Sequence, residues 1–293
     1  MNDIKIFAAD YWLRHGLDHL SPTQLNKSLD NWFFEYVYKD QQWRRNKKPS
    51  SKMFAGISAQ IGWDNYALFD KSKDESIDIA VEDYKKYKSQ FIGDEKEMKQ
   101  FEINLEDIPA VVKNYIQALD DLEIKKFSTI NSERNVDKWF DGIEVPITGK
   151  TDMETETFFI EAKTKWKRKS GKARKDGTFN YANIAAPTKP DPNHVKQISF
   201  YQEATKKPGY LIYATPSDYI IFNTKESEEL APHILESCLN NYKKTALVRQ
   251  NLLKFSEDPK EIAKNFIELD TTNINYYSYT DEELKEVRQF YEK

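Results

Sequence analysis

Residues 143–164 read IEVPITGKTDMETETFFIEAKT, and their apolar pattern decides the fold class. Apolar and polar residues alternate over 143–148 and again over 157–163, which predicts two β-strands. Successive side chains on a strand point to opposite faces, so Glu161 and Lys163 share one face of the second strand. The stretch therefore predicts a hairpin that presents an acid and a lysine side by side.

Asp152 lies at the end of the first of these strands, nine residues before Glu161. A hairpin turn between the strands brings Asp152 toward Glu161 and Lys163, although Glu154-Thr155-Glu156 is poor turn chemistry without glycine. Hard divalent cations such as Mg²⁺ prefer carboxylate oxygens, and a nearby lysine stabilises charge that builds on a phosphate. Taken alone, the spacing is also typical of an ordinary half-exposed hairpin.

The rest of the chain predicts helices around a small sheet. Ser21-Pro22-Thr23-Gln24 carries an N-cap serine and a proline at the first helical position, and apolar residues continue at helical spacing to Val37. Asp191-Pro192 and Asp258-Pro259 are further helix starts. Helices are expected near 53–70, 75–90 and 106–122, and strands at YLIYAT (210–215) and YIIFNT (219–224).

We therefore predict an α/β fold in one domain over residues 1–293. The expected parts are a mainly helical region over 1–130, a catalytic α/β core over 131–224 and a helical carboxy-terminal part over 225–293. A small mixed central sheet would carry the candidate site, with helices on its flanks.

Composition narrows the possible functions. The net charge is −4, so any nucleic-acid surface must be a local patch on an acidic protein. The single cysteine, Cys238, excludes an intramolecular disulfide, a zinc cage and an iron–sulfur cluster. No segment is apolar enough to span a membrane and the start lacks the order of a signal peptide, so we expect a cytoplasmic protein without a membrane partner.

A cationic segment directly follows the predicted strand. Residues 163–175 (KTKWKRKSGKARK) contain eight Lys or Arg and no acid. Charge runs are usually solvated loops, but this one begins at Lys163, so its charges should meet phosphates near the site. Trp166, Phe179 and Tyr181 are interspersed with the charges and are suited either to base stacking or to packing. The candidate DNA-binding residues are Lys165, Lys167, Arg168, Lys169, Lys172, Arg174 and Lys175.

Four motifs resemble the RecB-type branch of the PD-(D/E)XK nuclease superfamily, especially its bacteriophage exonucleases. GKTD (149–152) looks like the G-x-x-D of that branch, and IEAKT (160–164) looks like its apolar-(D/E)-x-K-T strand. QISFY (197–201) matches its Q-x-x-x-Y helix, and SPTQL (21–25) is similar to its first helix. The resemblance spans roughly residues 21–223.

The resemblance implies roles for particular residues. Asp152 and Glu161 would bind the metal together with the carbonyl of Ala162, and Lys163 would be the catalytic lysine. Gln197 and Tyr201, one helical turn apart, would fix the scissile strand or the lysine, while alone they are typical of a surface glutamine and a packing tyrosine. Asp64 would take the place of an early-helix acid, although Gln60 replaces the family's histidine. Among these, the metal ligands would be Asp152, Glu161, Ala162 and Asp64.

The activity implied is a Mg²⁺-dependent deoxyribonuclease in which metal-activated water hydrolyses phosphodiester bonds, with Mn²⁺ as a substitute for Mg²⁺. DNA is the expected partner, and exonuclease is the first choice by analogy. The same core could instead serve an endonuclease of restriction or junction-cleaving type, or a catalytically silent DNA-binding module. A monomer and a ring-shaped homo-oligomer are both open, as is the host cytoplasm if the chain is viral.

Overall fold

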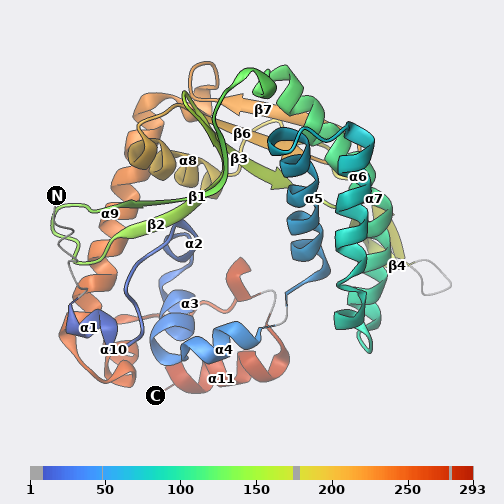
Figure 1. Ribbon diagram of the computed structural model, residues 1–293. Helices are drawn as coiled ribbons and strands as arrows, with labels where there is room; N and C mark the ends of the chain where they lie inside the picture. The colour runs from blue at the N-terminus through green and yellow to red at the C-terminus, as the bar shows by residue number, and fades with distance from the viewer. Residues whose placement is uncertain (1–8, 48, 174–178, 277–278, 293) are drawn as a thin grey trace.

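The computed structural model describes residues 9–47, 49–173, 179–276 and 279–292 (Figure 1). It has a five-stranded mixed sheet in the order β1-β2-β3-β6-β7, with all neighbours antiparallel except β3 and β6. A second sheet pairs β4 with β5. The strands are β1 (Ile130–Lys138), β2 (Ile147–Thr155), β3 (Phe159–Thr164), β4 (Arg168–Ala173), β5 (Phe179–Ala182), β6 (Gly209–Ala214) and β7 (Tyr219–Asn223).

Helices flank the central sheet on both faces, which confirms the predicted α/β class (Figure 1). Amino-terminal helices are α1 (Asp10–Leu13), α2 (Pro22–Leu25), α3 (Leu29–Phe33), α4 (Gln41–Asn46), α5 (Ser51–Leu68), α6 (Lys73–Lys85) and α7 (Glu95–Asp121). The later helices are α8 (Pro192–Thr205), α9 (Pro232–Phe255), α10 (Pro259–Phe266) and α11 (Asp281–Tyr291). Single turns are η1 (Phe34–Tyr38), η2 (Lys88–Phe91), η3 (Ile124–Lys126), η4 (Glu228–Leu230) and η5 (Ile274–Tyr276).

The two faces of β3 enter different hydrophobic cores, as its alternating pattern predicts. Phe159 packs in a core formed with α8, α9 and the amino-terminal segment, whereas Phe158 and Ile160 pack in a core formed with α5, α6 and α7. A one-residue shift in register would exchange the faces and bury Lys163 with α7. Burial on both sides thus fixes which way Glu161 and Lys163 point.

The β2–β3 turn forms without glycine because Thr155 replaces it with side-chain hydrogen bonds. Its Oγ1 accepts from the amides of Thr157 and Phe158 at 3.2 and 3.1 Å. The Thr155 amide donates to the Phe158 carbonyl at 2.8 Å. Threonine hydroxyls close turns in this way, so the hairpin predicted between Asp152 and Glu161 is present.

Two expectations about local structure need correction. The helix expected from Pro22 to Val37 is interrupted: α2 ends at Leu25, α3 starts at Leu29, and its last part continues as the π-helical turn η1. Polar residues Asn26, Lys27 and Ser28 occupy the break. The basic segment is not a simple loop, because β4 pairs with β5 in a two-stranded ribbon.

Other predicted boundaries agree closely with the structure. Ser21 caps α2, Asp191 caps α8 and Asp258 caps α10, each through a side chain that accepts from a backbone amide. The helix expected over 106–122 is α7, which starts earlier, at Glu95, and contains Pro109. No helix in the described part of the chain is both long and apolar enough to cross a membrane.

Candidate active site

Strands β2 and β3 bring Asp152 and Glu161 together where their ladder ends. The last paired residues toward the site are Met153 and Ile160. Beyond them, the Ala162 amide donates to Asp152 Oδ2 at 2.6 Å. A carboxylate thereby takes up a strand amide, which fixes the Asp152 side chain beside β3.

Glu161 and Lys163 lie on the same face of β3, as alternation requires. Lys163 Nζ donates to Glu161 Oε1 at 2.5 Å; the lysine side chain is 22% exposed and the glutamate side chain 4%. Burial lowers the pKa of Lys163, but attraction to Glu161 and Asp152 outweighs it and the pKa is raised. Lys163 therefore stays protonated and supplies a positive charge at the edge of the site.

Asp64 reaches the same region from α5. Ser132 Oγ on β1 donates to Asp64 Oδ2 at 2.6 Å and lies 3.4 Å from the Asp152 carbonyl oxygen. The pKa of Asp64 is raised to about 6. Burial is the main cause of the rise, the charge of Glu133 adds to it, and the hydrogen bond from Ser132 opposes it. Asp64 is thus a carboxylate that is costly to ionise without a cation.

Asp152 experiences the same imbalance more strongly. Burial raises its pKa well above the usual range, and repulsion from Glu161 adds to the rise. Lys163 and the Ala162 amide lower the pKa, while Asp64 raises it. Around Asp152, one lysine is therefore set against two further acids, Glu161 and Asp64. Carboxylates buried in excess of cations remain ionised only if a further cation joins them.

The unpartnered oxygen atoms indicate which cation would fit. Glu161 Oε2 and Asp64 Oδ1 are buried and have no hydrogen-bond partner. Among the described residues, no three His, Cys, Asp or Glu side chains are arranged to hold a metal by themselves. A set of about two carboxylates suits Mg²⁺, which keeps several waters and completes its shell with substrate phosphate oxygens. Asp152 and Glu161 fit that description, with the Ala162 carbonyl as a further oxygen donor.

Tyr201 packs beside this site, and Gln197 lies one turn earlier on α8. Tyr201 is 4% exposed and contacts Phe159 edge-on, with ring centroids 6.0 Å apart. Burial raises its pKa, and the charges of Glu161 and Asp152 raise it further. A Cβ added at Gly149 would lie 2.6 Å from the Tyr201 ring, so GKTD requires glycine to accommodate the tyrosine. Gln197 is half-buried, and its side chain forms no hydrogen bond with another described residue.

The cationic residues of 163–175 differ in their surroundings. Lys167 Nζ pairs with the buried Asp107 at 2.5 Å, which gives it a structural role. Lys165 lies over the Tyr213 ring at 5.4 Å, and Arg168 and Lys169 are exposed on β4. Lys172 is on β4, while Arg174 and Lys175 lie outside the described residues.

Of the three aromatic residues expected near the cations, Trp166 packs rather than stacks on bases. It is 4% exposed and belongs to the core formed with α5, α6 and α7. Tyr181 on β5 is half-buried, and Phe179 is the first residue of the same strand. Trp166 therefore packs in the core and is not available to stack on bases.

Sequence reasoning missed Ser132, Tyr115 and His194. Ser132 donates a hydrogen bond to Asp64. The Tyr115 hydroxyl is fully buried and unpartnered, and its pKa is raised by burial and by the charges of Asp152 and Asp64. His194 Nδ1 lies 2.7 Å from the Tyr213 hydroxyl; burial and then the charge of Lys163 lower its pKa to about 4. No local pattern marks these residues, because each reaches the site from a different helix or strand.

Comparison with known proteins gives no relative from which a role could be transferred. No protein-family profile matches the sequence, and no curated protein matches it. A solved structure of a Eubacterium rectale protein, provisionally named an exonuclease, is 12% identical over 86% of this chain and 87% of its own, with a TM-score of 0.43. The structure of SSO0001 is 17% identical over 56% and 69% respectively, with a TM-score of 0.29. Both scores are below 0.5, so the roles of the residues rest on this chain's own geometry.

Proposed function

We propose that this protein is a Mg²⁺-dependent DNA nuclease with Asp152, Glu161 and Lys163 at its centre. The observation that carries the proposal is a buried excess of carboxylate over cation, with Glu161 Oε2 left unpartnered beside a lysine. Ordinary structural ion pairs are balanced, and buried carboxylates lacking a counter-charge are costly. The imbalance is useful in a site that acquires Mg²⁺ and a phosphodiester.

Each residue has a task that follows from its position. Asp152 and Glu161 would hold the ion, and the Ala162 amide keeps Asp152 oriented between the two strands. When bound, Mg²⁺ supplies Lewis-acid activation of the phosphate and lowers the pKa of water. Lys163, only partly exposed, would shift from Glu161 toward the phosphate and stabilise the charge that builds there during attack.

Asp64 would act from the α5 side as a third acid. Its free Oδ1 and its hydrogen bond from Ser132 orient one oxygen away from β1. We infer that it binds a second ion or a water of the first one. Tyr201 and Gln197 on α8 would position the scissile strand next to Lys163.

DNA is the proposed substrate because the cationic segment 163–175 starts at Lys163 near the end of β3 and continues into β4. Lys165 and Arg168 follow Lys163 within five residues, and neither has a carboxylate partner among the described residues. Phosphates that approach this segment would also approach Asp152 and Glu161. The exonuclease mode is proposed by the motif resemblance alone, and an endonuclease would use the same centre.

The test is digestion of end-labelled linear duplex DNA with and without Mg²⁺. Wild type should shorten the DNA only with Mg²⁺, and folded Asp152→Ala and Lys163→Ala variants should not. Glu203→Gln, which removes a surface carboxylate of α8 paired with Lys138, is the matched control and should remain active. Cleavage of covalently closed circles would replace exonuclease with endonuclease, and DNA binding without any Mg²⁺-dependent cleavage would refute the nuclease proposal.

A further inference from the structure

A cavity of about 530 Å³ lies beside α9, away from the carboxylates, and is lined by cations and amides. Its walls come from the end of α2, the first turns of α8, the middle of α9 and the segment around η5. Of its fourteen lining residues, five are asparagines, four are Lys or Arg, and none is Asp or Glu. That lining is unexpected on a chain whose net charge is −4.

Arg249 is a buried cation in this lining. Its guanidinium is 1% exposed and donates to the carbonyls of Gln24 and Lys27, both at 2.9 Å. Its Nε has no partner, and no carboxylate in the described chain pairs with it. Burial lowers its pKa to about 9, which leaves it charged at neutral pH. Its guanidinium carbon lies 4.5 Å from the centroid of the Trp32 ring. Buried arginines are normally paired with acids, whereas this one has carbonyl and ring contacts and no carboxylate partner among the described residues.

Two lysines at the cavity add to that charge. Lys196 on α8 and Lys244 on α9 line it, and neither forms an ion pair with a described residue. Lys27 contributes less, because it pairs with Glu35 at 3.0 Å. The net positive charge therefore comes from Arg249, Lys196 and Lys244.

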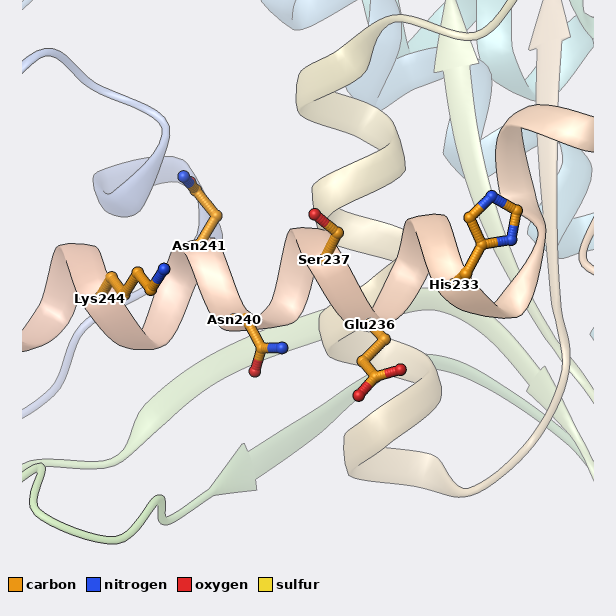
Figure 2. A pocket seen from close by; sticks show the side chains of 6 residues that line it. All are labelled: His233, Glu236, Ser237, Asn240, Asn241 and Lys244. Carbon is orange, nitrogen blue, oxygen red and sulfur yellow. The ribbon is translucent and has the colours of Figure 1, made fainter.

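Figure 2 shows how α9 divides polar side chains between its sides. Asn241 points to one side of the helix with Ser237, whereas Glu236 and Asn240 point to the other. Asn241 and Lys244 line both the cavity and the neighbouring hollow drawn there, but Glu236 lines only the hollow. Glu236 of α9 is therefore outside the lining of the cavity and does not cancel the positive charge there.

The cavity is linked to the candidate active site through α8. Asn193 and Lys196 line the cavity, while His194, between them, contacts Tyr213. Tyr213 is the β6 partner of Lys163 in the parallel ladder. A nucleic-acid strand held in the cavity would therefore lie along α8, whose His194 contacts the β6 neighbour of Lys163.

We propose that the Arg249 cavity binds a nucleotide phosphate, with Lys196 and Lys244 holding the anion and the asparagine amides contacting sugar or base. Lysine is a point-charge ligand for phosphate, and amides both donate and accept hydrogen bonds to base edges. The choice of a nucleotide over other phosphate anions rests on the proposed nuclease function. The anion is either one phosphate of a DNA strand or the phosphate of a free nucleotide.

Binding measured in EDTA tests this proposal apart from catalysis. The probe is a short fluorescein-labelled thymidine oligonucleotide, with inorganic phosphate and thymidine 5′-monophosphate as competitors. Lys196→Gln/Lys244→Gln should bind the oligonucleotide roughly tenfold more weakly and lose about 0.7 per contact from the salt slope. Lys260→Gln/Lys264→Gln on α10, which removes the same charge from exposed positions outside the lining, is the control.

The competitors identify the source of the phosphate. If thymidine monophosphate displaces the oligonucleotide from wild type but not from the cavity variant, the cavity takes a free nucleotide; if only strands compete, it takes the backbone. Equal oligonucleotide affinity in the folded cavity and control variants would overturn the proposal. A wild type that binds through the cavity but never hydrolyses DNA would refute the nuclease and leave the cavity assignment standing.

Discussion

The carboxylates around Asp152 and the cations around Arg249 each bury more charge of one sign than the described chain pairs, but the two signs are opposite. In the first region Glu161 and Asp64 raise the pKa of Asp152, and Lys163 is the cation that lowers it. In the second, two backbone carbonyls and the Trp32 ring contact the guanidinium, and no carboxylate among the described residues pairs with it. Elsewhere buried charge is paired or hydrogen-bonded, as in Lys167 with Asp107 and in Asp30, whose carboxylate accepts from the Tyr276 hydroxyl and the Asp270 amide. A region suited to receive an ion is therefore marked by buried charged groups with an unpartnered atom, such as Glu161 Oε2 and Arg249 Nε, rather than by charge itself.

The largest effect is expected from removing charge at the acidic centre. Glu161→Gln keeps the shape of the side chain but removes a ligand, and Lys163→Met removes the cation beside it. Each should lower Mg²⁺-dependent DNA hydrolysis by about a thousandfold, the range typical of lost electrostatic stabilisation in an active site. Initial rates on linear DNA, with circular dichroism to establish folding, measure the effect. A wild-type rate of DNA hydrolysis in either variant would contradict the assignment of the catalytic centre to Glu161 and Lys163 on β3.

A smaller effect is expected when Mg²⁺ is added without DNA. An ion that binds only the folded chain stabilises it by about 2.7 kcal/mol at a hundredfold excess over its Kd, or roughly 4 °C in a chain of 293 residues. Thermal unfolding in EDTA and in Mg²⁺ should show that rise for wild type and not for Asp152→Asn. An identical rise in both proteins would place the ion elsewhere.

The pH dependence of Asp64 sharpens the comparison further. Its folded-state pKa of about 6 exceeds the ordinary aspartate value of 3.8, so the folded state binds more protons between these pH values. The stability due to Asp64 is therefore complete below the unfolded pKa and is lost as pH rises through about 6. Asp64→Asn should gain about 2 kcal/mol over wild type between pH 4 and pH 8 in EDTA. Denaturant unfolding at both pH values tests this, with the exposed Glu133→Gln expected to change less.

The smallest effect separates two neighbouring residues of the cationic segment. Arg168 is exposed on β4, whereas Lys167 pairs with Asp107. Arg168→Gln should lower the salt slope of duplex DNA binding by about 0.9, the value for one phosphate contact. Lys167→Gln should instead lower the melting temperature by leaving Asp107 unpaired. Equal salt slopes for wild type and Arg168→Gln would contradict the assignment of Arg168 to DNA.

Local features of this fold could be predicted from sequence because they depend on neighbours in the chain. Alternation placed Glu161 and Lys163 on one face, and cap residues located α8 and α10. The break after Leu25 was missed because apolar spacing continues through it, while the stabilising contact, Arg249 on the Lys27 carbonyl, comes from α9. Long-range contacts of this kind leave no periodic signal.

The candidate site divides in the same way. Asp152, Glu161 and Lys163 could be found because twelve residues contain them all. Ser132, Tyr115 and the Arg249 cavity could not, since they arise where separate elements meet. The charge imbalance itself emerges only once those elements are folded together.

Manganese binding probes the Asp152–Glu161 centre itself, because it requires neither a chosen DNA nor turnover. Mn²⁺ titrated into the metal-free protein can be followed by the loss of its free electron paramagnetic resonance signal. Wild type should take up Mn²⁺ at a site for which Mg²⁺ competes, and Asp152→Asn and Glu161→Gln should each lose that site while Glu203→Gln retains it. Uptake that is the same in all four proteins would contradict a metal centre at Asp152 and Glu161.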